Sequence, residues 1–102
     1  MSDYTLTRKA EADLFEIAVH GYRQFGVRQA EAYAAGLDQT FALLADNPGM
    51  GRRADAIRPG VHRHEHASHV ILYERVEGGV LILAVVHRRS VRRLSDRALG
   101  GP

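Results

Sequence analysis

The most constraining feature of this 102-residue sequence is a pair of helical repeats with one glycine, Gly26, between them. Apolar residues recur at intervals of three and four on both sides of it, which is typical of two amphipathic helices. Thr7 is placed to cap the first helix, and Asn47-Pro48-Gly49 ends the second. Because so short a connection forces the helices to run antiparallel, the sequence predicts a helical hairpin. The two stripes are Ala10, Leu14, Ile17, Ala18, Tyr22 and Phe25, then Ala30, Tyr33, Ala34, Leu37, Phe41 and Leu44.

Strand-like segments account for most of the remaining chain. Tyr4-Thr5-Leu6 precedes the first helix, and three further segments follow a loop over residues 48–60. Ser90 is placed to cap a short C-terminal helix that runs through Ala98. A chain of this length is too small for two cores, so we expect one domain over residues 1–102. The predicted fold is α+β: an N-terminal strand, an antiparallel helical hairpin on a small, mainly antiparallel sheet, and a short C-terminal helix. The three later strands are expected at Val61–His66, His69–Val76 and Val80–His87.

The last two strands read as a hairpin whose type I′ turn is Gly78-Gly79. This turn would place Val76 opposite Leu81. The face that carries Val70 and Leu72 is mostly apolar, so we expect it to meet the helices. The opposite face is either an open binding surface or an ordinary solvated sheet face, and the sequence leaves both readings open. It carries His69, Tyr73, Arg75 and Arg88.

A net charge of +2 conceals an asymmetry between the two halves of the chain. The part through Asn47 has four basic and seven acidic residues, whereas the part from Pro48 has ten arginines and five acidic residues. A basic surface attracts nucleic acid, a ribosome or an acidic protein, and charge alone does not choose among them. Arginine favours planar, bidentate contacts with phosphate or carboxylate groups.

Several function classes lack their sequence signatures. There is no cysteine, which excludes disulfides, cysteine-ligated zinc and thiol nucleophiles. Phosphate-binding loops, a dinucleotide fingerprint and a serine nucleophile elbow are missing as well. No signal peptide is visible, and the apolar run Val80–Val86 is too short to span a bilayer. We therefore expect a cytoplasmic protein with no cofactor and no membrane partner.

Histidines are concentrated in the second half of the chain. His62, His64 and His66 alternate along one strand and share a face, but a polar edge strand explains them better than a metal site. His69 and His87 are candidate acids and bases. Together with Tyr73 and Arg88 they would suffice for a metal-free ribonuclease, although nothing in their spacing requires one.

The order of elements and several short strings resemble the ParE-type toxins of the RelE/ParE toxin–antitoxin superfamily. Each string is weak alone, whereas their order and spacing over nearly the whole chain are specific. They are Leu6-Thr7 with Ala12-Asp13-Leu14, Gly26-Val27-Arg28-Gln29-Ala30, Ala45-Asp46-Asn47-Pro48 with Gly51-Arg52, Arg58-Pro59-Gly60, Ser68-His69-Val70 and Val86-His87-Arg88-Arg89.

The resemblance implies a toxin that inhibits DNA gyrase and is neutralised by a ParD-like antitoxin. The antitoxin would wrap the toxin with an acidic C-terminal segment, which suits the positive surface near Arg52, Arg58 and Arg88. Operator DNA would meet the toxin only indirectly, through the antitoxin. The residues expected to contact target or antitoxin are Arg52, Arg58, His69, Tyr73, Arg75, His87 and Arg88.

Two alternatives remain open. The first is a RelE-like, ribosome-dependent mRNA endoribonuclease that uses His69, Tyr73, His87 and Arg88. Against it, the only lysine is Lys9, and the tail ends in Gly100-Gly101-Pro102 with no aromatic residue. The second is an inactive toxin homologue that acts only as an antitoxin-binding module. A gyrase inhibitor would not be an enzyme, so catalysis is expected only under the first alternative.

Overall fold

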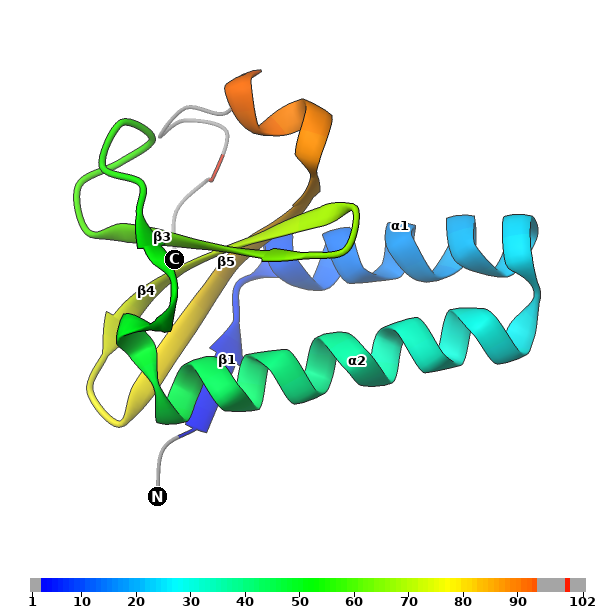
Figure 1. Ribbon diagram of the computed structural model, residues 1–102, viewed down its shortest axis with the longest axis horizontal. Helices are drawn as coiled ribbons and strands as arrows, with labels where there is room; N and C mark the ends of the chain where they lie inside the picture. Colours follow the sequence, from blue (N-terminus) through cyan, green and yellow to red (C-terminus); the bar gives the residue numbers. More distant parts are fainter. Residues whose placement is uncertain (1–2, 94–98, 100–102) are drawn as a thin grey trace.

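A computed structural model of the chain describes residues 3–93 and Leu99 (Figure 1). It confirms the α+β fold, with a helical hairpin inserted between the first strand and the others. The elements in order are β1 (Asp3–Leu6), α1 (Arg8–Phe25), α2 (Val27–Asp46), the 3-10 helix η1 (Pro48–Met50), β2 (Arg52–Arg53), β3 (Val61–His66), β4 (His69–Val76), β5 (Gly79–His87) and the 3-10 helix η2 (Arg88–Arg93). The predicted helix Ser90–Ala98 differs, because residues 88–93 form η2 and residues 94–98 lie outside the described part.

One mixed sheet holds all the strands, in the order β1-β5-β4-β3-β2. β1 runs parallel to β5, and the other neighbours are antiparallel. The helices lie side by side, and the turn between them projects well beyond the sheet (Figure 1). In the part of the chain that the structure describes, no helix is long and apolar enough to cross a membrane.

The predicted ends of α1 are confirmed. The hydroxyl of Thr7 accepts a hydrogen bond from the Ala10 N–H at 3.1 Å, which satisfies an otherwise unpaired helical donor. Gly26 ends the helix at φ 87°, a backbone conformation that favours glycine, and its N–H donates to the Tyr22 carbonyl at 3.0 Å.

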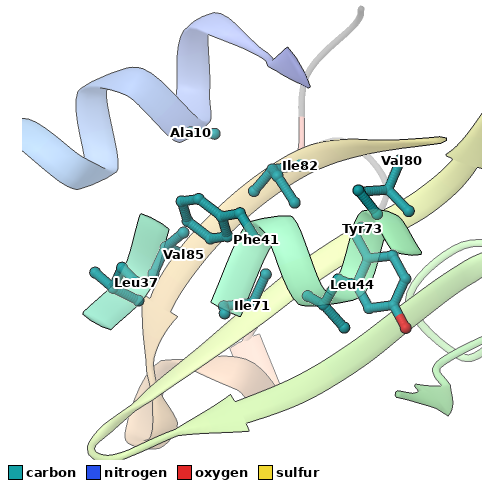
Figure 2. Packing of buried hydrophobic residues seen from close by; sticks show 10 residues of the cluster. Ala10, Leu37, Phe41, Leu44, Ile71, Tyr73, Val80, Ile82 and Val85 are labelled. Atoms are coloured by element: carbon teal, nitrogen blue, oxygen red, sulfur yellow. The ribbon is translucent and has the colours of Figure 1, made fainter. Parts of the chain in front are cut away.

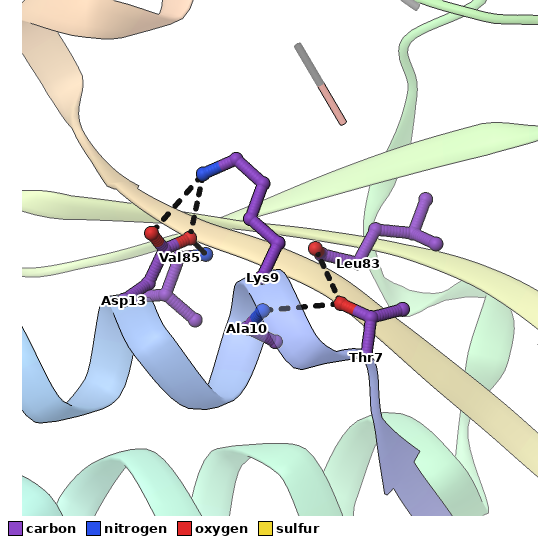
Figure 3. Close-up of polar contacts among 6 residues, drawn as sticks. All are labelled: Thr7, Lys9, Ala10, Asp13, Leu83 and Val85. Carbon is purple, nitrogen blue, oxygen red and sulfur yellow. Dashed lines mark hydrogen bonds and ion pairs between the residues drawn. The ribbon is translucent and has the colours of Figure 1, made fainter. Parts of the chain in front are cut away.

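Thr7 and Asp13 also join α1 to the edge of β5 (Figure 3). The Thr7 hydroxyl donates to the Leu83 carbonyl at 2.9 Å, and the Asp13 carboxylate accepts from the Val85 N–H at 2.9 Å. β1 pairs with β5 only as far as Leu6 opposite Ile82. The two side chains therefore satisfy backbone groups of β5 where β1 has ended.

The main core lies between the helices and one face of the sheet (Figure 2). Leu37, Phe41 and Leu44 of α2 are buried there, as their spacing predicted. They pack against sheet residues from β4 and β5. These are Ile71, Tyr73, Val80, Ile82 and Val85.

The other sheet face is buried as well, which corrects the predicted orientation. Val70 and Leu72 were expected to meet the helices, but they lie in a second core on the opposite side. That core is closed by residues of the loop after β2 and of η2, namely Ala54, Ile57 and Val91, and by Leu99. Because both faces are apolar, a count of apolar residues does not decide which one the helices cover.

The register of the β4–β5 hairpin also differs from the prediction. Val76 lies opposite Gly79 instead of Leu81, so the turn residues are Glu77 and Gly78. Gly79 is needed for a different reason, since a Cβ there would lie 1.7 Å from the Asp3 carbonyl oxygen of β1.

A β-bulge on β5 changes the faces further along the same hairpin. Leu72 pairs with Ala84 and Tyr73 with Ile82, which leaves Leu83 as the extra residue. Beyond the bulge, His69 lies opposite His87, whereas the register that follows from the predicted turn pairs His69 with Arg88 and Val70 with His87.

Candidate functional site

An apolar groove of about 700 Å³ opens between the two helices where the sheet ends. Its size is typical of sites that bind small molecules or protruding side chains. The walls come from the turn half of each helix, and the floor comes from the ends of β4 and β5. The principal lining residues are Ile17, Gly21 and Phe25 of α1, Ala30, Tyr33 and Ala34 of α2, and Ser68, His69 and His87 of the floor.

The groove exists because the helices are longer than the sheet they cover. α1 has 18 residues and α2 has 20, about 27 and 30 Å of helix. Near the turn the helices pack on each other, with Gly21 next to Ala30. Tyr22 is 59% exposed and Phe25 is 61% exposed there. Exposed apolar surface of this kind is typical of an interaction site.

Tyr33 and His69 form a polar contact on the groove floor. The Tyr33 hydroxyl lies 2.6 Å from His69 Nδ1 and 3.2 Å from the His66 carbonyl oxygen. Burial raises the pKa of Tyr33, so its hydroxyl keeps its proton. Burial also lowers the pKa of His69, and nearby His87, His66 and His20 add to this against the opposing effect of Asp13. A neutral His69 therefore pairs with Tyr33 through Nδ1, and the single hydroxyl proton of Tyr33 serves either this contact or the His66 carbonyl.

His87 is the second predicted site residue in the groove. Its ring lies 5.7 Å from that of His69, edge to face, because the bulge places the two residues opposite each other. The sequence predicted both histidines as site residues, with His69 on the open face and His87 on the face that meets the helices. The sequence analysis missed Tyr33 as a site residue. Tyr33 belongs to the apolar stripe of α2, and only its hydroxyl distinguishes it from an ordinary core residue.

Tyr73 is structural, which contradicts its predicted place on an open surface. Its side chain is fully buried under α2. The hydroxyl accepts from the Gly51 N–H at 3.0 Å and donates to the Pro48 carbonyl at 2.7 Å. Burial raises the pKa of Tyr73 against the effects of Gly51 and Arg75. A Cβ on Gly51 would lie 2.5 Å from this hydroxyl, which explains a glycine there.

The predicted arginines lie apart from the groove. Arg75 is exposed on β4, and Arg88 begins η2. Arg58 lies 3.5 Å from Glu74, and Arg52 pairs with Glu65. The seven residues expected to contact a partner therefore do not form one site.

A second hollow, of about 440 Å³, lies beside the second core and is walled by arginine. Arg52 and Arg53 of β2, Arg63 of β3 and Arg92 of η2 line it. Burial alone would raise the pKa of Glu65, but Arg52 and Arg63 outweigh it and the pKa is lowered.

The alternating histidines of β3 share one face, as predicted, and that face meets the helices. His66 Nδ1 lies 3.2 Å from the Thr40 hydroxyl, and the His62 ring stacks on Tyr73. Burial lowers the pKa of His66, and nearby His64 adds to this. Within the described ranges, no group of three or more histidine, aspartate or glutamate side chains is placed to hold a metal ion.

Comparison with known proteins gives one consistent result. The family described as ParE toxin of type II toxin-antitoxin system, parDE, matches residues 4–92. Toxin ParE1 of Caulobacter vibrioides is 40% identical over 86% of this chain and 91% of its own length. Toxin ParE1 of Mycobacterium tuberculosis is 38% identical over the same shares, and Toxin ParE of Escherichia coli is 35% identical over 98% of this chain and 100% of its own.

A solved structure titled "Chromosomal ParDE TA system from P. aeruginosa" is similar in fold. Its TM-score is 0.71 at 25% sequence identity, over 85% of this chain and 96% of that one. The matches with this chain extend over nearly all of each relative's length, and the similar fold of the solved structure agrees with them. This chain belongs to the ParE toxin family of type II toxin–antitoxin systems.

Proposed function

We propose that this ParE-family toxin inhibits DNA gyrase and is neutralised by a ParD-like antitoxin that docks in the groove of the helical hairpin. The uncovered apolar groove is the observation that carries the antitoxin contact. The gyrase target is supported by membership of the ParE toxin family alone.

The groove suits an amphipathic segment of an antitoxin. Its walls are apolar and its floor holds the polar rings of His69 and His87, so a helix that inserts apolar side chains would bury Phe25 and the exposed part of Tyr33. Charged residues stand at the rim, among them Glu16 and Asp38. Polar rims around an apolar centre are typical of specific protein interfaces.

The side of the toxin that carries the arginines is assigned to the target. Arg52, Arg58, Arg75 and Arg88 do not line the groove, so an antitoxin segment in the groove does not cover them. A toxin of this kind acts by binding and is not an enzyme. Gyrase works on the bacterial chromosome, so the proposed site of action is the cytoplasm.

The ribonuclease alternative has less support. It would use His69, Tyr73, His87 and Arg88 together, but Tyr73 is buried with both hydrogen-bonding roles of its hydroxyl satisfied. Arg88, the cation of this alternative, begins η2 and is not among the residues that line the groove with His69 and His87.

The target is tested by inducing the toxin in bacteria that lack the antitoxin and following DNA and protein synthesis by pulse labelling. We expect DNA synthesis to stop first, with a DNA-damage response. If protein synthesis stops first, the ribonuclease alternative replaces gyrase inhibition. Unchanged growth, with the toxin shown to be present and folded, would instead identify an inactive homologue.

A further inference from the structure

Two arginine clusters that are far apart in the sequence meet on the sheet side opposite the helical hairpin. Arg52-Arg53 and Arg63 come from β2 and β3, and they line the same hollow as Arg92 of η2. The other arginines of η2 are exposed on the same 3-10 helix. We name this surface the arginine face; its members are Arg52, Arg53, Arg63, Arg88, Arg89, Arg92 and Arg93.

The arginine face has a large excess of positive charge. Among the described residues, two carboxylates, Glu65 and Asp55, pair with three of its seven arginines. The pairs of Arg52 and Arg53 are exposed, with these side chains 69% and 78% accessible, so they contribute little and are readily exchanged. Within the same described part, no ion pair engages the four arginines of η2, and the Nε of Arg63 is buried without a hydrogen-bond partner.

The surroundings of these arginines favour a phosphate backbone over a protein partner. The apolar residues at the hollow, chiefly Ile57 and Val91, already pack in the second core and offer few anchors for another protein. No exposed phenylalanine or tyrosine lies among the lining residues, so stacking of unpaired bases has no platform there. Guanidinium groups pair with phosphate oxygens in bidentate fashion, and such contacts need no apolar anchor.

We propose that the arginine face binds the phosphate backbone of duplex DNA, without reading its sequence. The biological setting rests on the proposed function, because gyrase works on duplex DNA and the toxin would contact both. Binding to DNA by the toxin alone is a separate property. A failure of gyrase inhibition would therefore leave the DNA contact to be judged on its own measurement.

The test is fluorescence anisotropy of a labelled duplex of about two helical turns, titrated with the purified chain at several salt concentrations. Four phosphate contacts predict that affinity falls about 100-fold between roughly 50 and 200 mM salt. No binding at the lowest salt concentration, or binding that does not depend on salt, would overturn the proposal.

A matched pair of double variants tests the location. Arg92→Gln with Arg93→Gln should weaken binding and lower the salt slope by about two. Arg23→Gln with Arg28→Gln removes the same charge from the helical hairpin and should leave the slope unchanged. Equal effects of the two double variants, each checked for folding by circular dichroism, would contradict a localised site.

A competitor separates DNA from an acidic protein segment. Poly-glutamate of matched charge should displace the duplex only at higher concentration, because a carboxylate chain lacks the fixed phosphate spacing of a duplex. Tighter binding of poly-glutamate than of DNA at equal salt would overturn the proposal and assign the arginine face to an acidic protein partner.

Discussion

His69 connects the stability of the protein to pH. Its Nδ1 forms a hydrogen bond with the Tyr33 hydroxyl at 2.6 Å, and its ring faces His87 at the end of the sheet. Burial first, and then nearby His87, His66 and His20, lower its pKa against the opposing effect of Asp13. The folded chain therefore binds protons at His69 less readily than the unfolded chain does.

We expect the free energy of unfolding to decrease as the pH falls from about 7.5 to 5.5. A histidine with a lowered pKa contributes fully above its ordinary value of about 6.5, and the contribution is lost as the pH falls through the folded value. His66 contributes in the same direction. Urea unfolding at several pH values should show a shallower decrease in His69→Gln than in the unchanged chain. Identical pH dependence in both would show that His69 is not a principal source of the effect.

Tyr73 shows why single side chains were harder to predict than helices. The sequence gives a tyrosine in a strand of alternating polarity, which suits a surface position as well as a buried one. Its two hydrogen bonds go to Gly51 and Pro48, in the loop after α2. Only the fold brings that loop over β4, so no local pattern identifies the partners that make burial of the hydroxyl acceptable.

At the scale of elements, the edge of β5 depends on α1. β1 covers the first part of that edge, and the side chains of Thr7 and Asp13 satisfy the groups beyond it (Figure 3). Asp13 also forms an ion pair with Lys9 at 3.0 Å on the helix surface. The Asp13 carboxylate therefore both binds the backbone of β5 and forms an ion pair with Lys9 on its own helix.

Removing the Asp13 carboxylate should lower stability by about 1–3 kcal/mol, because the Val85 N–H is left without its partner. Asp13→Ala tests this in urea unfolding, and Asp13→Asn, which keeps an acceptor oxygen, should lose less. Lys9→Gln removes the ion pair alone and should cost less than about 1 kcal/mol. If Lys9→Gln were as destabilising as Asp13→Ala, the ion pair and not the β5 contact would be the main contribution.

The bounds of α1, α2, β3, β4 and β5 were predictable because each depends on a local period or a terminating residue, whereas β2, inside the expected loop 48–60, and η2 were not predicted. The strand pairing was not predictable, for two physical reasons. Of two adjacent glycines, Gly78 has the positive φ that the turn requires, whereas Gly79 lacks a Cβ that would clash with the backbone of β1. A local turn rule cannot separate these roles. The bulge at Leu83 then reverses the faces of β5. The groove exists because the helices extend beyond the sheet. The bulge then places His87 beside His69 on its floor.

At the scale of the whole molecule, two different surfaces lie on opposite sides of one sheet. The helical-hairpin side has an apolar groove, and the other side has the arginine face. The acidic first half of the sequence builds the helices, and the basic second half builds most of the sheet and η2. The charge asymmetry therefore becomes a spatial one, which suits a protein that meets antitoxin and target on separate surfaces.

If the two surfaces act separately, substitutions in the groove should abolish neutralisation and leave toxicity intact. Ala34 lines the groove and is exposed, so Ala34→Glu and Ala34→Arg should fold normally. Either charge would be buried beneath a docked antitoxin segment, and we expect at least about 2 kcal/mol of lost affinity, roughly thirtyfold. Two opposite charges are used because a favourable pairing could mask only one of them.

Ala35 supplies the matched control, because it is exposed on the same helix and does not line the groove. Ala35→Glu and Ala35→Arg should remain neutralised, as should the double variant Arg92→Gln with Arg93→Gln. Growth with and without co-expressed antitoxin, with calorimetry of the purified pairs, measures both properties. Rescue of both Ala34 variants at unchanged affinity would place the antitoxin elsewhere. Failure of the arginine double variant to bind antitoxin would show that the two surfaces are not independent, because one partner would then span both sides of the sheet.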